Sequence, residues 1–207
     1  MYTPATFRVD DPKVVDAIIE QHPFATLVVN GPNGLEASPL PLLLDRERRE
    51  IVGHLARSNP LAKLLASGAD ALTIFQGPHA YVSPRWYVDA INVPTWNYVH
   101  VHVTGAATMF EDREELVGFL GRLVDRFEKG ARAPWKFELP DDFVDDLVKA
   151  IIGFRIPMRK VEAKLKLSQN RDPADASGAL AGLEASSDAA SREVAAWMRS
   201  IGVGVPR

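Results

Sequence analysis

The sequence contains no cysteine among its 207 residues. This absence excludes disulfide bonds, thiolate metal sites and cysteine nucleophiles together. Long apolar runs are missing too, since no stretch approaches the roughly 20 apolar residues that a membrane-spanning helix needs. The first eleven residues lack a basic segment followed by an apolar one. We therefore expect a cytoplasmic protein with no membrane partner.

An excess of positive charge is also missing. The chain has 24 Lys and Arg against 27 Asp and Glu, for a formal net charge of -3. Proteins that hold nucleic acid through its phosphates usually present a basic surface, and no helix-turn-helix pattern is visible here. The sequence therefore does not support direct DNA binding. Because 46% of the residues are hydrophobic and 25% are charged, a packed globular core is expected.

The order of patterns along the chain predicts a β-rich middle with helices attached to it. Asp11-Pro12 and Asn59-Pro60 are typical helix starts, and Asp112 with Glu115 forms a capping box before a third helix. Further helices are expected at residues 141–151 and near the C-terminus. Strands are predicted at residues 24–29, 35–44, 51–56, 71–75, 80–83, 98–104 and from 160 onward. Few and short helices favour a mainly antiparallel β-barrel over a parallel sheet.

Residues 53–60 carry a strand into a helix and place a guanidinium, a hydroxyl and an amide at the junction. The first turn of a helix binds anions, so Ser58, backbone amides and Arg57 could hold a phosphate, with Lys63 one turn further on. An alternative stays open, in which Ser58 or Asn59 only caps the helix. No glycine-rich phosphate fingerprint decides between the two.

Two other clusters point to a ligand without identifying it. Aromatic residues gather between Tyr81 and Tyr98, where a ligand site, a subunit contact and ordinary core packing all remain open. A polar run from Lys164 to Arg171 is either a solvated strand face or a site for an anionic cofactor. Hydrolytic motifs are absent from the sequence.

A metal site is not predicted. His100 and His102 lie two residues apart on a predicted strand and therefore point to the same side. A third ligand would have to come from His54, His79 or Glu111 through folding. Solvent-facing or hydrogen-bonded histidines explain the pair more simply.

Taken in order, these segments resemble the PaiB-type family of FMN-binding negative transcriptional regulators, from Met1 to about Arg171. The resemblance lies in the following segments: Met1-Tyr2, Pro23-Phe24-Ala25-Thr26-Leu27, Gly53-His54-Leu55-Ala56 with Asn59-Pro60, Gly77-Pro78-His79-Ala80-Tyr81, Ser83-Pro84 with Trp86-Tyr87, Val93-Pro94-Thr95-Trp96-Asn97-Tyr98, Ile152-Gly153-Phe154, and Lys166-Leu167-Ser168-Gln169-Asn170-Arg171. Pro39 departs from the family pattern, which usually has a histidine there. The substitution removes an N–H and an imidazole from a strand expected to border the flavin.

The resemblance implies a six-stranded split β-barrel of the pyridoxamine-phosphate-oxidase-like fold, a homodimer, and FMN bound between the subunits. Residues 1–171 would form the FMN-binding domain, and residues 172–207 a helical extension packed on it. Lys166, Gln169 and Arg171 would reach over from the partner chain. The full set of expected cofactor contacts is Ser38, Leu40, His54, Ala56, Arg57, Ser58, Asn59, Lys63, Gln76, Tyr81, Trp96, Lys166, Gln169 and Arg171.

The family name implies a transcriptional regulator. An alternative is an FMN-dependent oxidoreductase or flavin reductase acting on a small-molecule substrate, because the cofactor itself carries the redox chemistry. Tyr81, His79 and His102 are the candidate proton donors for that reaction. A haem-binding barrel is a third reading.

Overall fold

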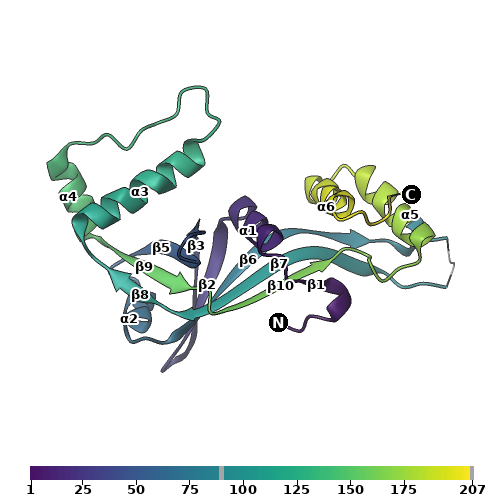
Figure 1. Ribbon diagram of the computed structural model, residues 1–207, viewed down its shortest axis with the longest axis horizontal. Coiled ribbons are helices and arrows are strands. Elements are labelled where there is room, and N and C mark those ends of the chain that lie inside the picture. Colours follow the sequence, from purple (N-terminus) through teal and green to yellow (C-terminus); the bar gives the residue numbers. More distant parts are fainter. Residues whose placement is uncertain (89–90, 206–207) are drawn as a thin grey trace. The chain divides into compact units, whose positions relative to one another are not determined.

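The structure is a computed structural model that describes residues 1–88 and 91–205 (Figure 1). The helices are α1 (Pro12–Gln21), α2 (Pro60–Ala66), α3 (Arg113–Glu128), α4 (Asp141–Lys149), α5 (Pro173–Glu184) and α6 (Ala189–Ser200), with short 3-10 helices η1 (Ala5–Phe7) and η2 (Pro84–Trp86). The strands are β1 (Arg8–Val9), β2 (Phe24–Gly31), β3 (Gly34–Pro41), β4 (Leu43–Asp45), β5 (Glu50–Ala56), β6 (Asp70–Val82), β7 (Thr95–Ala106), β8 (Thr108–Phe110), β9 (Ile151–Pro157) and β10 (Lys160–Lys166).

The strands form two sheets. One has six strands in the order β1-β10-β7-β6-β2-β3, and the other has four in the order β4-β5-β9-β8. The chain also divides into two compact units. The first unit comprises Met1–His22, Phe75–His102 and Val161–Arg207, and the second comprises Pro23–Ile74 and Val103–Lys160. The long strands β6 and β7 contribute residues to both units. No helix among the described residues is long and apolar enough to cross a bilayer.

The hairpin of β2 and β3 shows how the two prolines shape one sheet edge. β3 pairs with β2 in antiparallel register, with Thr26 opposite Pro39 and Phe24 opposite Pro41. It ends the six-stranded order, and an edge position tolerates prolines because it leaves N–H positions unpaired. The prediction of one strand over residues 35–44 is wrong in extent. The Leu42 amide still donates to the Pro23 carbonyl at 2.8 Å, in the register of β2 and β3, and the chain then crosses to the other sheet, where Leu43–Asp45 forms β4.

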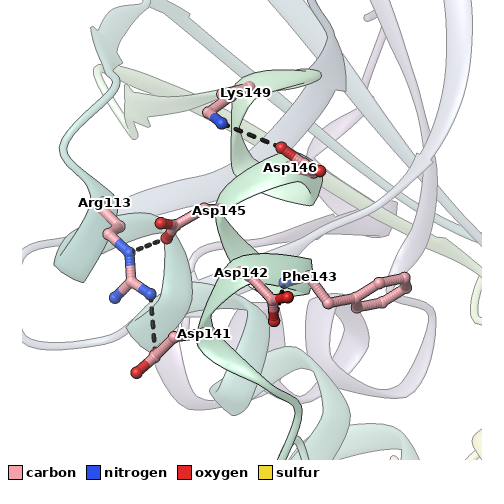
Figure 2. A network of polar contacts seen from close by, with 7 residues as sticks. All are labelled: Arg113, Asp141, Asp142, Phe143, Asp145, Asp146 and Lys149. Carbon is pink, nitrogen blue, oxygen red and sulfur yellow. Dashed lines mark hydrogen bonds and ion pairs between the residues drawn. The ribbon is translucent and has the colours of Figure 1, made fainter.

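In the second unit, α3 and α4 cover the four-stranded sheet with an apolar core of Val52, Phe110, Leu116, Phe119, Val144 and Val148. Asp112 caps α3 as predicted, because its carboxylate accepts the Glu115 amide proton at 2.9 Å. Figure 2 shows how α4 is fixed to α3: Arg113 donates to Asp145 at 2.5 Å and to Asp141 at 3.0 Å. Phe127, near the end of α3, lies outside this core and is 51% exposed.

The long strand β6 corrects a prediction. The sequence predicts two short strands at 71–75 and 80–83 separated by Gly77-Pro78, whereas β6 runs without a break from Asp70 to Val82. The register of β2 covers only Ala71–Ile74, so the later half of β6 lacks that neighbour and a missing Pro78 N–H costs little. Gly77 lets the backbone pass close to β7, since a Cβ there would lie 2.9 Å from Val99.

The C-terminal region holds two helices where the sequence analysis resolved one. α5 and α6 lie side by side (Figure 1). α5 packs on Trp86 through two glycines: a Cβ on Gly178 would lie 1.9 Å from the Trp86 carbonyl oxygen, and one on Gly182 would lie 2.2 Å from its ring. The backbone of α5 therefore contacts Trp86 directly. Residues 206–207 of the predicted extension lie outside the described residues.

Candidate functional site

The fourteen expected cofactor contacts fall into two groups, one in each unit. The second unit holds Ser38 and Leu40 on β3, His54 and Ala56 on β5, Arg57, Ser58 and Asn59 in the following turn, and Lys63 on α2. The first unit holds Gln76 and Tyr81 on β6, Trp96 on β7, Lys166 on β10, and Gln169 and Arg171 in the turn after β10. We call these the turn group and the sheet group.

Asn59 organises the turn group. Its side-chain oxygen accepts the Leu61 amide proton at 3.0 Å and caps α2, and its amide nitrogen donates to Ser38 Oγ at 3.3 Å. Of the two residues that the sequence offered as a helix cap, Ser58 and Asn59, it is Asn59 that caps α2. Two nearby backbone amides are already used, because Arg57 N donates to the Ala150 carbonyl and Asn59 N to the Ala56 carbonyl, both at 2.9 Å. A phosphate at this turn would therefore depend mainly on side chains.

Three cationic or hydroxyl side chains of the turn differ in how they are engaged. Arg57 donates to Glu111 Oε2 at 2.6 Å and to the Lys149 carbonyl at 2.9 Å. Ser58 and Lys63 are exposed, and neither side chain makes a hydrogen bond or ion pair with another described residue. One cation and one hydroxyl are thus available to a ligand at once, and Arg57 only after it releases Glu111.

His54, on β5, packs against an aromatic ring of the core. Its ring meets the buried Phe119 ring edge-on, with the centroids 5.7 Å apart, and its Nδ1 is buried without a hydrogen-bond partner. Burial lowers the pKa of His54, so the neutral imidazole is favoured. The side chain therefore packs beside the core under α3. Leu40 is half-buried, and Ala56 is exposed and pairs with Ile151.

Exposed aromatic rings mark the sheet group. Tyr81 is 47% exposed and Trp96 is 52% exposed, with the two ring centroids 6.3 Å apart. His79 lies beside Trp96, with a centroid separation of 5.7 Å. A hollow of about 360 Å³ is lined here by Met1, His79, Trp96, Tyr98 and His100. Gln76 is exposed on β6.

Lys166 and Gln169 are held by their own chain. Lys166 Nζ donates to Thr95 Oγ1 and, at 2.6 Å, to the Trp96 carbonyl. Burial, together with the charges of Lys164 and Arg171, lowers the pKa of Lys166. The Gln169 side chain accepts from the Leu167 amide at 2.6 Å and donates to the Leu165 carbonyl at 2.5 Å.

Arg171 is held just as firmly. Its guanidinium lies over the Tyr87 ring, 4.8 Å from the centroid, and donates to Asn92 Oδ1 at 2.5 Å. Tyr87 is buried, and this burial raises the pKa of its hydroxyl, against a smaller opposing effect of Arg171. The preceding Ser168 adopts a positive φ of 69°, where its buried hydroxyl exchanges hydrogen bonds with Asn97. The turn that carries Gln169 and Arg171 is thus fixed by the hydrogen bonds between Ser168 and Asn97.

The residues that hold these candidates could not be predicted from the sequence. Thr95, Asn92 and Asn97 each bind a partner more than 70 positions away, and no local pattern reveals such pairs. Glu111, considered as a metal ligand, instead pairs with Arg57. The described residues contain no group of three or more side chains that could hold a metal ion. The His100 and His102 ring centroids lie 6.4 Å apart.

Comparison with solved structures defines the class of protein. The fold resembles the FAD and heme binding protein from Mycobacterium smegmatis, with a TM-score of 0.62, 19% identity, and coverage of 77% of this chain and 73% of that one. It also resembles the flavocytochrome Anf3 from Azotobacter vinelandii, with a TM-score of 0.62, 18% identity, and coverage of 77% and 69%. The chain therefore has the fold of these two proteins, a split β-barrel of mainly antiparallel strands with attached helices.

Sequence comparison gives the family. The model of the "Putative FMN-binding domain" matches residues 1–160, and the chain belongs to this family. The protease synthase and sporulation protein PAI 2 of Bacillus subtilis is 35% identical over 178 residues, which cover 84% of this chain and 85% of that protein. The predicted PaiB-type resemblance, the fold class and the cofactor FMN are thereby confirmed.

Proposed function

We propose that two copies of the chain form a cytoplasmic homodimer that binds FMN at the subunit interface and acts as a flavin-dependent regulator. The observation that carries the dimer is the exposure of Tyr81 and Trp96 on neighbouring strands. Aromatic residues bury a large area and are enriched at interfaces. A flavin and a partner subunit would cover these rings together.

The turn group suits the phosphate end of FMN. Ser58 and Lys63 have free side chains, and Arg57 adds a guanidinium that can bind a phosphate through two parallel hydrogen bonds. Asn59 and Ser38 would fix the turn, and the backbone of β3 around Leu40 would face the ring system. Bound FMN supplies reversible electron and hydride transfer, and the chain's residues bind and orient it.

The sheet group would complete the site. Lys166, Gln169 and Arg171 would come from the partner copy, since the polar heads of these residues can meet a phosphate or the carbonyl edge of a flavin. Gln76, Tyr81 and Trp96 would line the same interface. His54 and Ala56 would support the turn without touching FMN, because His54 packs on Phe119 and its Nδ1 is buried without a hydrogen-bond partner.

The regulatory role rests on the relative's name, which links it to protease synthesis and sporulation. A net charge of -3 argues against direct operator binding, so the proposed regulation acts through a partner or through metabolite levels. Deleting the gene should change the expression of target genes, and a variant that does not bind flavin should fail to restore it. Restoration by such a variant would contradict flavin-dependent regulation.

One observation favours a second function, an FMN-dependent oxidoreductase or flavin reductase. His79 and His100 line the hollow of about 360 Å³ beside Trp96. Burial, then the charges of His102, His79 and Lys164, lower the pKa of His100, which leaves a neutral imidazole for proton transfer. Anaerobic mixing with NADH or NADPH tests this function: rapid bleaching of the flavin supports it, and an unchanged spectrum rules out these donors.

The binding proposal is tested by adding FMN to purified protein and separating the mixture by size. Flavin absorbance should travel with a species of twice the chain mass. Flavin that elutes with a monomer would contradict the interface site. Flavin that elutes free would show that this chain, with Pro39 in place of the family's histidine, binds FMN weakly.

A further inference from the structure

A chain of three polar side chains leads from the proposed cofactor site into the C-terminal helix α5. Arg171 donates to Asn92 Oδ1 at 2.5 Å. The amide nitrogen of Asn92 donates in turn to Asp175 Oδ2 at 3.2 Å. The other oxygen of Asp175 accepts the Val88 backbone amide at 2.8 Å. Asp175 is only 6% exposed, so this contact is part of the packed interior of the first unit.

The chemistry of these groups fixes the direction of every hydrogen bond. An ionised carboxylate only accepts, so Asn92 must turn its NH2 toward Asp175. The carbonyl oxygen of Asn92 then has to face Arg171, whose guanidinium only donates. If the acceptor at position 175 became a donor, Asn92 would gain by flipping, and a flipped amide would point its NH2 at Arg171.

The position of Asp175 is itself fixed by the packing of α5. Asp175, Gly178 and Gly182 are spaced three and four residues apart and so share one helix face. The two glycines bring that face against Trp86 with no room for a Cβ. Asp175 is therefore held beside Val88 and Asn92 by contacts that do not involve Arg171.

We propose that Asp175 is a positioning residue that acts through Asn92 to aim Arg171 at bound FMN, so that the C-terminal helix α5 is a working part of the cofactor site. The inference rests on the proposed role of Arg171 in binding FMN. It gives a function to a helix that lies outside residues 1–160, the part matched by the family model.

The test uses four variants of the full chain: Arg171→Ala, Asp175→Asn, Asn92→Asp, and the swap that combines the last two. Asp175→Asn retains an oxygen for the Val88 amide, places a donor in front of Asn92 where the parent chain has an acceptor, and removes one negative charge. In the swap, the new amide at position 175 donates to the new carboxylate at position 92, which still accepts from Arg171. Dissociation constants for FMN are measured by quenching of flavin fluorescence, and thermal unfolding of each apo variant checks the fold.

We expect Arg171→Ala and Asp175→Asn each to weaken FMN binding on the order of tenfold, the loss of about one charge-assisted hydrogen bond. The swap should recover most of the affinity of the parent chain. A merely structural Asp175 would change the affinity and the unfolding temperature together, in Asp175→Asn and again in the swap. A positioning role lowers the affinity in Asp175→Asn and restores it in the swap while the unfolding temperature stays the same.

Failures at the two levels are distinguishable. An unchanged affinity in Arg171→Ala overturns the role of Arg171 in the proposed function and the inference with it. A weakened Arg171→Ala beside an unchanged Asp175→Asn overturns the inference alone. A swap that binds FMN as weakly as Asp175→Asn also overturns it, even when all four variants unfold at the same temperature.

Discussion

The turn group and the sheet group supply similar side chains in different states. In the turn after β5 and the first part of α2, the side chains of Ser58 and Lys63 have no hydrogen-bond or ion-pair partner among the described residues, and Arg57 is held by an exposed ion pair. Beside β10, Lys166 and Arg171 are each tied to specific oxygens of the same chain. The turn group therefore has hydrogen-bond donors available to a ligand, whereas the side chains of the sheet group are already fixed by contacts within the chain. Pre-ordered groups bind with a smaller entropy cost, and free groups adapt more easily.

The largest effect is expected from removing the turn group's contacts with phosphate. Arg57→Ala combined with Ser58→Ala should raise the Kd for FMN roughly 100-fold, since two hydrogen bonds to a charged group contribute about 1.5 kcal/mol each. The Kd for riboflavin, which lacks the phosphate, should change little. Titration with both ligands makes the measurement. Equal losses for the two ligands would show that the turn does not meet the phosphate.

The next effect concerns the packing of α5 on Trp86, close to the turn that carries Arg171. Gly182→Ala forces a methyl group into the Trp86 ring and should lower the free energy of unfolding by about 1–3 kcal/mol, a typical cost of overpacking. Gly121→Ala on α3 is the matched control, because no atom lies within 4 Å of its added Cβ and alanine favours a helix. Urea denaturation should separate the two variants. Equal stability would mean that α5 does not pack closely on Trp86.

A smaller effect is expected from releasing Arg57. Glu111→Gln removes the ion pair at 2.6 Å, whose side chains are 38% and 59% exposed. Such an exposed pair contributes about 0–1 kcal/mol, so stability should hardly change. FMN binding should become a few-fold tighter, and more so at low salt, because Arg57 no longer has to leave a carboxylate. Weaker binding in Glu111→Gln would indicate that Glu111 positions Arg57 for the ligand.

The smallest effect is a pH dependence of stability. Burial lowers the pKa of His54 in the folded chain, so below about pH 6.5 the unfolded state takes up the proton more readily. The contribution of neutral His54 to the free energy of unfolding is fully present above that pH, and it is lost as the pH falls toward the pKa of His54 in the folded chain. His54→Gln should flatten part of this decline, whereas His22 and His100, whose pKa values burial also lowers, keep the rest. Urea midpoints at pH 7.5 and 5.5 give the comparison. An unchanged decline would place His54 in contact with water.

Local chemistry predicted the elements well because each depends on nearby residues. Asp11, Asn59 and Asp112 cap the helices that the sequence assigned to them, since a cap forms between residues two or three positions apart. The continuous β6 was missed because its tolerance of Gly77-Pro78 depends on neighbouring strands. Propensity alone does not contain that information.

The sequence proposes the candidate residues through their chemical types, but it does not show which contacts hold their side chains. A lysine, a glutamine and an arginine in one short run predict an anion site, and the run from Lys166 to Arg171 is compact. Its partners Thr95 and Asn92 lie more than 70 residues earlier and are brought in by the pairing of strands and helices. The hydrogen-bond partner of each of these side chains is therefore set by the tertiary structure.

The two prolines of β3 limit how a second copy can attach. Proline nitrogens carry no hydrogen, and residues two apart in a strand turn their N–H positions to the same side. Because the ladder with β2 continues through Pro39 and Pro41, the missing donors belong on the outer edge. An incoming strand would find neighbouring acceptor sites without donors between them, which protects the edge against aggregation. Extension of the six-stranded sheet by a second copy is therefore disfavoured at the β3 edge.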